Sequence, residues 1–188
     1  MGPPGHGVPD PEVLVAGDWD EIRTVVDVGG GTGSLLAEIL RARPSLHGTL
    51  VDRPATVARS ADVFRGAGVA DRVTLAGQSF FEPLPAAADL YLLSKVLVDW
   101  PDDQARAILI RCAEAARPSG RVVIVGDVSI ADSGQPSPSL LMLVLVGGKD
   151  RTLAEFRDLA RSAGLEVVAT GHQSSGRSLV ECRPVPTP

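Results

Sequence analysis

The feature that most constrains the fold is a glycine-rich turn between an apolar strand and a helix. The run Val25-Val26-Asp27-Val28 has the character of a short buried strand and leads into Gly29-Gly30-Gly31-Thr32-Gly33. A helical pattern over Ser34–Arg43 starts directly after the turn. Glycines let the backbone approach a ligand closely at the carboxyl end of a strand and the amino end of a helix. The stretch therefore predicts an α/β domain with a ligand site at this turn.

The residues around the turn indicate which ligand it holds. A dinucleotide fingerprint counted from Gly29 requires a small residue where this chain has Ser34. Counted from Gly31, the fingerprint requires the small residue at Leu36. Asp27 would repel a pyrophosphate and suits a cationic ligand such as a sulfonium cofactor that carries an α-amino group. A nicotinamide dehydrogenase is therefore the disfavoured alternative.

Hydrophobic patterning alternates between strands and helices along the chain. Strands are predicted at Thr24–Val28, Gly48–Val51, Val73–Ala76, Leu90–Leu93, Val122–Val125, Glu166–Ala169 and Ser178–Cys182. Helices are predicted at Ser34–Arg43, Ala55–Gly66, Asp102–Ala116 and Thr152–Ala163, with helical turns at Leu140–Val146 after a Ser/Pro loop at Ala131–Ser139. Thr152 with Glu155 three residues later forms a capping-box pattern. This order predicts a doubly wound, mostly parallel seven-stranded sheet of the Rossmann-like α/β class with a C-terminal β-hairpin.

Composition excludes several classes of protein. A chain of 188 residues supports one core, and its net charge of -5 with few aromatic residues argues against nucleic acid as a partner. No apolar run reaches transmembrane length, so no membrane association is expected. Cys112 and Cys182 lack metal-ligand spacing, which indicates reduced thiols in a cytoplasmic protein without a metal site. Residues 1–19 are predicted to be a flexible leader before one domain at 20–188.

Four further motifs follow the glycine turn in order. They are Leu50-Val51-Asp52, Ser79-Phe80-Phe81-Glu82-Pro83-Leu84-Pro85, Leu97-Val98-Asp99-Trp100 and Gly147-Gly148-Lys149-Asp150-Arg151-Thr152. From Asp20 to about Arg183 the chain resembles the class I S-adenosylmethionine-dependent O-methyltransferases, in particular the catalytic domain of bacterial small-molecule enzymes related to plant phenol and caffeate methyltransferases. The resemblance implies S-adenosylmethionine or S-adenosylhomocysteine as cofactor and an aromatic small molecule as substrate.

The resemblance also concerns the ends of the chain. Relatives usually carry an N-terminal helical domain that dimerises and helps to wall the substrate pocket. This chain is expected to lack that domain, as an excised catalytic domain or as a natural short form. The expected partner is therefore a second copy in a homodimer or a separate chain that supplies the helical domain.

The glycine turn and the end of the second strand are predicted to hold most of the cofactor. Asp27 with Gly29, Gly31 and Gly33 should hold its methionine part. Asp52 ends the second strand, where a carboxylate can accept both ribose hydroxyls. Capping of the next helix is the alternative role of Asp52.

Three further residues are expected at the adenosine part of the cofactor. Ser79 is at the position where the family reads the adenine amine, although a loop serine is the competing interpretation. Phe80 is expected beside the adenine, with a place in the core as its alternative. Ser94 ends the fourth strand, where the family places a residue that touches the cofactor.

The substrate side departs from the family at Val98. Plant-like relatives have His-Asp-Trp where this chain has Val98-Asp99-Trp100, and that His deprotonates the substrate hydroxyl. Asp127 and Asp150 fall at the positions of the two acids that orient the His. Asp99, Asp127 or Asp150 is therefore the candidate base if burial raises its pKa, with helix capping as the alternative role of Asp99.

Two residues are expected to touch the substrate. Trp100 lies two residues after Val98, the position of the family's base. Met142 forms an apolar stripe with Leu141 and Leu145, which is equally typical of a hydrophobic core. The predicted function is O-methylation of an aromatic or polyketide natural product without the usual His base. The alternative is a homologue that binds S-adenosylmethionine but does not methylate, either with other chemistry or as a noncatalytic partner of another chain.

Overall fold

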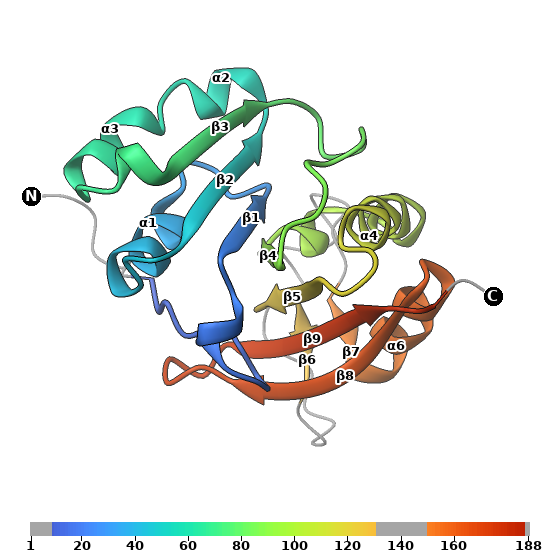
Figure 1. The fold of residues 1–188 in the computed structure, drawn as a ribbon. Helices are drawn as coiled ribbons and strands as arrows, with labels where there is room; N and C mark the ends of the chain where they lie inside the picture. The colour runs from blue at the N-terminus through green and yellow to red at the C-terminus, as the bar shows by residue number, and fades with distance from the viewer. Residues whose placement is uncertain (1–8, 131–149, 187–188) are drawn as a thin grey trace, which may run out of the picture.

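A seven-stranded sheet forms the centre of the molecule (Figure 1). The structure, a computed structural model, describes residues 9–130 and 150–186. The strands lie in the order β3 (Val73–Gly77), β2 (His47–Asp52), β1 (Thr24–Val28), β4 (Leu90–Ser94), β5 (Arg121–Val125), β9 (Ser178–Pro184) and β8 (Leu165–His172). The first five are parallel, whereas β9 runs antiparallel to both of its neighbours. The predicted mostly parallel sheet with a terminal hairpin is confirmed.

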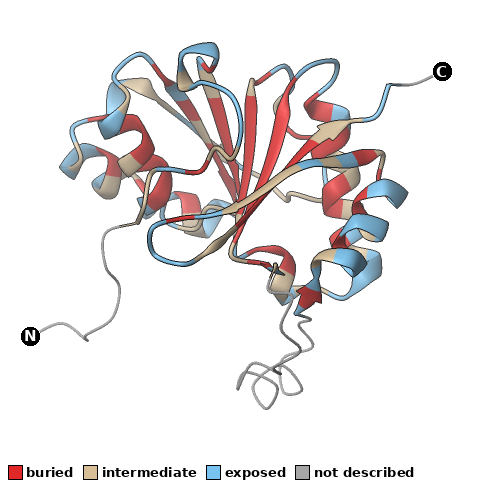
Figure 2. Cartoon of the chain, turned by 90° about the horizontal axis from the view of Figure 1, so that it is seen from below, coloured by how far each residue is buried: buried red, intermediate tan, exposed pale blue. Residues whose placement is uncertain are grey.

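Helices cover both faces of this sheet, which explains why the central strands are apolar throughout. Helices α1 (Ser34–Ala42) and α3 (Ala61–Gly66) pack with one apolar cluster, in which Leu36 and Phe64 are buried. Helices α4 (Asp102–Ala115) and α6 (Leu153–Ser162) pack with the other cluster. Figure 2 shows the central strands buried between these two helical layers.

The predicted helix Ala55–Gly66 is wrong in one respect, because it is two helices. Helix α2 (Pro54–Val57) ends before α3 begins at Ala61. Between them the buried Ser60 hydroxyl donates to the carbonyl oxygen of Val57 at 2.6 Å. A serine side chain that bonds to the backbone in this way competes with regular helix hydrogen bonding, and periodicity does not reveal it.

The segment from residue 9 to Glu21 packs against the domain, whereas the sequence predicted a flexible leader up to residue 19. Val13 is fully buried, and Gln173 Nε2 donates to the carbonyl oxygens of Asp10 and Glu12. The Arg43 guanidinium lies 3.6 Å from the centroid of the Trp19 ring, next to a 3-10 helix at Trp19–Glu21. The described part of the N-terminal segment therefore belongs to the domain.

A second, two-stranded parallel sheet was not predicted. Strand β6 (Val128–Ser129) pairs with β7 (Arg151–Thr152), so that Val128 lies opposite Arg151. At the end of β7 the predicted capping box is present, since Thr152 and Glu155 exchange hydrogen bonds. This small sheet brings the segment after β5 next to the segment before α6.

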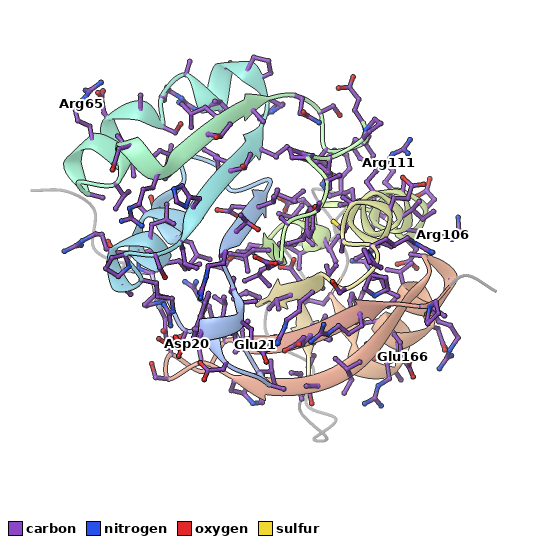
Figure 3. All side chains as sticks on the ribbon, viewed as in Figure 1. Asp20, Glu21, Arg65, Arg106, Arg111 and Glu166 are labelled. Carbon is purple, nitrogen blue, oxygen red and sulfur yellow. The ribbon has the colours of Figure 1, made fainter. Side chains whose placement is uncertain are left out.

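Some charged side chains lie at the periphery of the fold. Arg65, Arg106 and Arg111 project outward from the helices in Figure 3. Within residues 9–130 and 150–186, no helix combines the length and the apolar character needed to cross a membrane.

Candidate functional site

The candidate site lies at the carboxyl ends of β1, β2 and β4. Gly29 begins the turn after β1 and its N–H donates to the Val51 carbonyl oxygen at 2.7 Å. Gly29, Gly31 and Gly33 have φ values of 71°, 61° and 81°, which only glycine adopts without strain. The turn therefore depends on its glycines for its backbone path.

The four glycines of the turn differ in what surrounds them. A Cβ on Gly33 would lie 2.2 Å from Phe64 Cζ, so this glycine makes room for helix packing. A Cβ on Gly30 would lie 2.2 Å from Asp27 Oδ2, whereas one on Gly31 would meet no atom within 4 Å. Gly31 therefore faces open space, and Gly30 covers a carboxylate. Sequence reasoning did not single out Gly30.

Asp27 is a buried carboxylate beneath this turn. It is 1% exposed, and neither of its oxygens has a hydrogen-bond partner among the described residues. Burial, with a smaller contribution from the negative charge of Asp52, raises the pKa of Asp27 to about 7. An unpartnered buried carboxylate is costly. It therefore fits a site for a cationic group.

Asp52 ends β2 beside the turn, as predicted. Its Oδ2 accepts a hydrogen bond from Gly31 N at 2.9 Å, and its Oδ1 accepts one from Arg53 N at 2.7 Å. Each carboxylate oxygen can accept a second hydrogen bond. Asp52 therefore braces the turn and keeps acceptor capacity for a ligand hydroxyl.

A cavity of about 330 Å³ opens beside Gly29 and Asp52. Phe80, Phe81 and Trp100 form part of its wall, with ring centroids 5.1 to 5.9 Å apart. The other lining residues are Arg53, Ser79, Lys95, Val96 and Asp99. Trp100 meets both phenylalanine rings edge-on, and the three rings give the cavity an apolar wall against which a planar ligand can pack.

The loop between β4 and α4, residues 95–101, forms one side of the cavity and is held by two buried charged side chains. Asp127 Oδ2 accepts hydrogen bonds from Val96 N and Leu97 N, both at 3.0 Å. Arg151 donates to the carbonyl oxygens of Leu97 and Trp100, each at 2.8 Å. Burial raises the pKa of Asp127 to about 7, against the lowering effect of the two amides.

The structure separates the three predicted catalytic acids. Asp99 is exposed and lines the cavity. Asp127 is buried and bonded to backbone amides, and Asp150 is exposed. Val98, at the position of the family's base, is half-buried in a 3-10 helix at Leu97–Asp99 and is not part of the cavity wall.

The remaining predicted site residues are distributed as follows. Ser79, Phe80 and Trp100 line the cavity. Ser94 ends β4, is half-buried and is not part of the wall. Met142 lies outside the described residues. Sequence reasoning missed three residues of the site, Lys95, Val96 and Arg151. The Lys95 φ of 55° is a strained backbone conformation that only a structure reveals.

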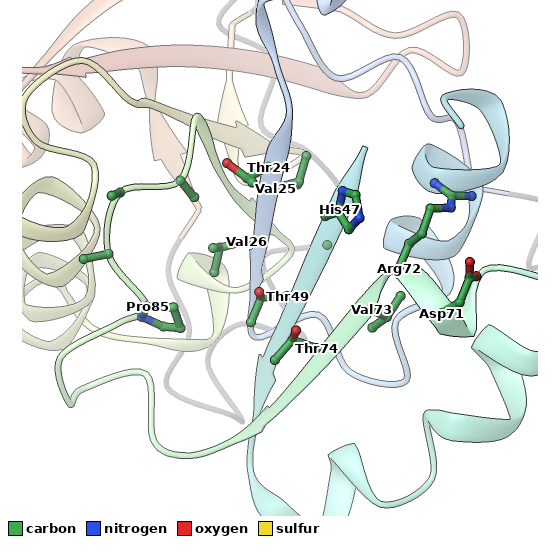
Figure 4. A pocket seen from close by; sticks show the side chains of 14 residues that line it. Thr24, Val25, Val26, His47, Thr49, Asp71, Arg72, Val73, Thr74 and Pro85 are labelled. Carbon is green, nitrogen blue, oxygen red and sulfur yellow. The ribbon is translucent and has the colours of Figure 1, made fainter. Parts of the chain in front are cut away.

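A second cavity, of about 310 Å³, lies at the opposite, amino-terminal part of the strands. Figure 4 shows Thr24, Thr49 and Thr74 on three adjacent strands, with Pro85 beside them. This cavity has no buried unpartnered side chain among the described residues that line it. In open α/β sheets ligands bind at the carboxyl ends of the strands, so the first cavity is the candidate site.

Comparison with known proteins agrees with this geometry. A model of the O-methyltransferase domain family matches residues 7–166. The chain belongs to this family. The resemblance inferred from the glycine turn and the four later motifs is therefore confirmed.

Two known Streptomyces proteins are similar to the chain. Over 157 aligned residues the chain is 43% identical to aclacinomycin 10-hydroxylase RdmB of Streptomyces purpurascens. The alignment covers 81% of this chain and 42% of that protein. Over 164 aligned residues the chain is 44% identical to 2,7-dihydroxy-5-methyl-1-naphthoate 7-O-methyltransferase of Streptomyces carzinostaticus. This alignment covers 87% of this chain and 49% of that enzyme.

A solved O-methyltransferase from neocarzinostatin biosynthesis, in complex with S-adenosylmethionine and 2-hydroxy-5-methyl naphthoic acid, has the same fold. It superposes with a TM-score of 0.80 at 43% identity, and the match covers 89% of this chain and 50% of that one. The chain thus spans about half the length of the relatives it matches.

Proposed function

We propose that the chain is the S-adenosylmethionine-binding domain of an O-methyltransferase that acts on a hydroxyl group of an aromatic or polyketide natural product. The observation that carries the proposal is Asp27, a buried carboxylate without a partner among the described residues, beneath a glycine turn that faces open space. The solved relative with S-adenosylmethionine and a naphthoic acid supports the same assignment.

The residues at the turn fit this cofactor. Asp27 offers a negative charge to the α-amino group of the methionine part, and the open space at Gly31 leaves room for that part. Asp52 has acceptor capacity left for the ribose hydroxyls. Phe80 and Ser79 line the adjoining cavity, where an adenine ring can pack. S-adenosylmethionine, when bound, supplies a methyl group activated by a sulfonium sulfur.

The position from which the family's histidine removes the proton of the acceptor hydroxyl is occupied by Val98 in this chain. Loss of a general base costs roughly 10²–10⁴-fold in rate, which is about 3–5 kcal/mol. Correct positioning of the reacting groups supplies about 7–11 kcal/mol, so methyl transfer to an acidic phenol can proceed without the base. Of the three predicted acids, Asp99 is the one that lines the cavity, beside Trp100, but it is exposed and so lacks the burial expected of a carboxylate base.

The test is transfer of labelled methyl groups from S-adenosylmethionine to phenols and naphthols of graded acidity. We expect transfer that becomes faster as the acceptor pKa falls, because such acceptors need less help from a base. An Asp27→Asn variant serves as the control and should lose cofactor affinity. The absence of transfer to every acceptor would reject methyl transfer in a protein that binds S-adenosylhomocysteine and contains the residues that complete the acceptor site.

That rejection would favour a second candidate function, a homologue that binds S-adenosylmethionine and does not methylate. Two observations support it: the 43% identity to aclacinomycin 10-hydroxylase and the absence of a histidine at Val98. The same assay separates the two candidates, because only the first one transfers label.

We also propose that the acceptor site is completed by residues outside the matched region, whether they lie on the same polypeptide, on another copy of this chain or on a separate chain. The support is that the match covers only 42% and 49% of two relatives. Size-exclusion chromatography with light scattering shows whether a second copy is bound. Two buried free cysteines favour a reducing, cytoplasmic location.

A further inference from the structure

The loop between β4 and α4 has little internal support for its conformation. Its described backbone hydrogen bonds include those from Asp99 N to Val96 O, at 3.3 Å, and from Trp100 N to Leu97 O, at 3.2 Å. The first is slightly longer than the usual range of about 2.7–3.2 Å for N–H···O hydrogen bonds, and the second is at its upper end. The conformation of this loop therefore depends on groups outside it.

Two charged side chains supply that support, and both bond to the backbone of Leu97. Asp127 Oδ2 accepts from the N–H groups of Val96 and Leu97. Arg151 donates to the carbonyl oxygens of Leu97 and Trp100 and to Asp102 Oδ1, at 2.9 Å, on the first turn of α4. Leu97 thus has its N–H held by the acid and its carbonyl held by the guanidinium.

The small sheet β6–β7 explains why these two residues meet. Val128, the residue after Asp127, pairs with Arg151 across the sheet. Asp127 and Arg151 are 3% and 1% exposed. Charged groups are rarely buried to this extent unless they are paired and hydrogen-bonded, and here five of their hydrogen bonds go to this loop and to the start of the next helix.

The loop contacts both halves of the candidate site. Val96 lies over the glycine turn, since a Cβ on Gly29 would be 2.9 Å from Val96 Cγ2. Trp100, at the other end of the loop, packs edge-on against Phe80 and Phe81. A displacement of the loop would therefore alter the cofactor turn and the aromatic wall together.

We propose that Asp127 and Arg151 are a pair of positioning residues that set the conformation of residues 95–101, and through it the cofactor turn and the aromatic wall of the cavity. Asp127 therefore holds the loop that contains Val98, whereas the family's acid at this position orients the catalytic histidine. The expected effect on cofactor binding rests on the proposed function, whereas the expected effect on the loop conformation does not.

The test uses Trp100 as a local probe. The chain has two tryptophans, so a Trp19→Phe parent reports fluorescence from Trp100 alone. In that parent we compare Asp127→Ala and Arg151→Met with the conservative variants Asp127→Asn and Arg151→Lys. The matched control is Arg121→Met, because Arg121 is also a buried arginine and pairs with Glu21 and Glu181, away from the loop.

Asp127→Ala and Arg151→Met should make Trp100 more accessible to acrylamide and weaken S-adenosylhomocysteine binding by roughly tenfold, as expected when a charge-assisted hydrogen bond is lost. Asp127→Asn and Arg151→Lys should recover part of both effects, because each keeps one hydrogen-bonding group. Arg121→Met should lower the unfolding midpoint and leave both readouts unchanged.

Unchanged Trp100 quenching in folded Arg151→Met and Asp127→Asn proteins would overturn the proposal. The same change in Arg121→Met would also overturn it, because a general loss of stability would then explain the result. If the parent does not bind S-adenosylhomocysteine, the proposed function fails, whereas quenching still decides whether the pair positions the loop.

Discussion

Asp27 couples the charge of the site to the binding of its ligand. Burial and the Asp52 charge raise the pKa of Asp27 to about 7 from 3.8, so the protonated form is favoured in the ligand-free fold. The contribution of Asp27 to stability is therefore greatest at low pH and is lost as pH rises from about 4 to 7. A cationic ligand reverses this preference because it requires the ionised carboxylate.

We therefore predict that the affinity for S-adenosylhomocysteine falls by up to about tenfold for each pH unit below pH 7, as one proton must be released on binding. Calorimetry at pH 5.5 to 8 measures this dependence. Asp27→Asn should bind weakly at every pH with this dependence removed. The ligand 5′-methylthioadenosine, which lacks the amino group, is the second control, and an equal pH dependence for it would contradict the assignment.

Val98 is the residue at which this chain departs from its plant-like relatives. Val98→His is predicted to increase methylation of an unactivated phenol, but by less than the roughly 10²–10⁴ typical of a general base. The reason is that Asp127 Oδ2 already accepts two backbone N–H groups, which leaves Oδ1 for the imidazole, and Asp150 is exposed.

The measurement for Val98→His is initial rate against pH, since an imidazole base acts above its pKa of about 6.5. Val98→Asn is the matched control, with a polar side chain that cannot take up a proton. If the His variant binds cofactor normally and methylates no faster than the Asn variant, the site does not place a base at this position.

At the scale of elements, the glycines between β1 and α1 have separable roles. Gly31→Ala is predicted to cost about 1–2 kcal/mol of stability, because alanine is strained in a left-handed backbone conformation. No steric clash adds to this cost, since the new Cβ would meet open space. Gly33→Ala adds a clash with the buried ring of Phe64, and overpacking of this kind costs roughly 1–3 kcal/mol more. Gly31→Ala should nevertheless weaken cofactor binding, since its methyl group enters the space assigned to the ligand.

Urea unfolding and calorimetry of the two glycine variants provide the comparison. A Phe64→Leu change should restore part of the stability of Gly33→Ala and none of that of Gly31→Ala. Equal stabilities of the two alanine variants would show that the Phe64 contact does not govern the packing of α1 on α3.

For the whole molecule, we predict that deletion of residues 1–18 destabilises the domain. Burial of the Val13 side chain alone contributes about 1.5–3 kcal/mol, and Gln173 would also lose its backbone partners. The free energy of unfolding in urea measures the loss, with deletion of residues 1–8 as the matched shorter truncation. A domain as stable without residues 9–18 would show that this segment contributes no net stability.

The sequence predicts the positions of the strands along the chain and the glycine turn because both follow from local patterns. Periodicity and turn residues place β1, β2, β4 and β5 within one or two residues of their observed ends. Strands β6 and β7 have only two residues each, which is too short for any periodicity. The roles of Asp127 and Arg151 depend on that pairing, so spacing along the chain could not predict them.

The position of β9 has a consequence for synthesis on the ribosome. Strand β5 finishes at Val125, but its neighbour in the sheet, β9, is not translated until residues 178–184. Until then the apolar run Val122–Val125 has an unpaired edge, and Arg121 lacks Glu181. Exposed apolar edges of this kind promote association between nascent chains. The domain therefore has to be released almost entirely from the exit tunnel before its sheet can close.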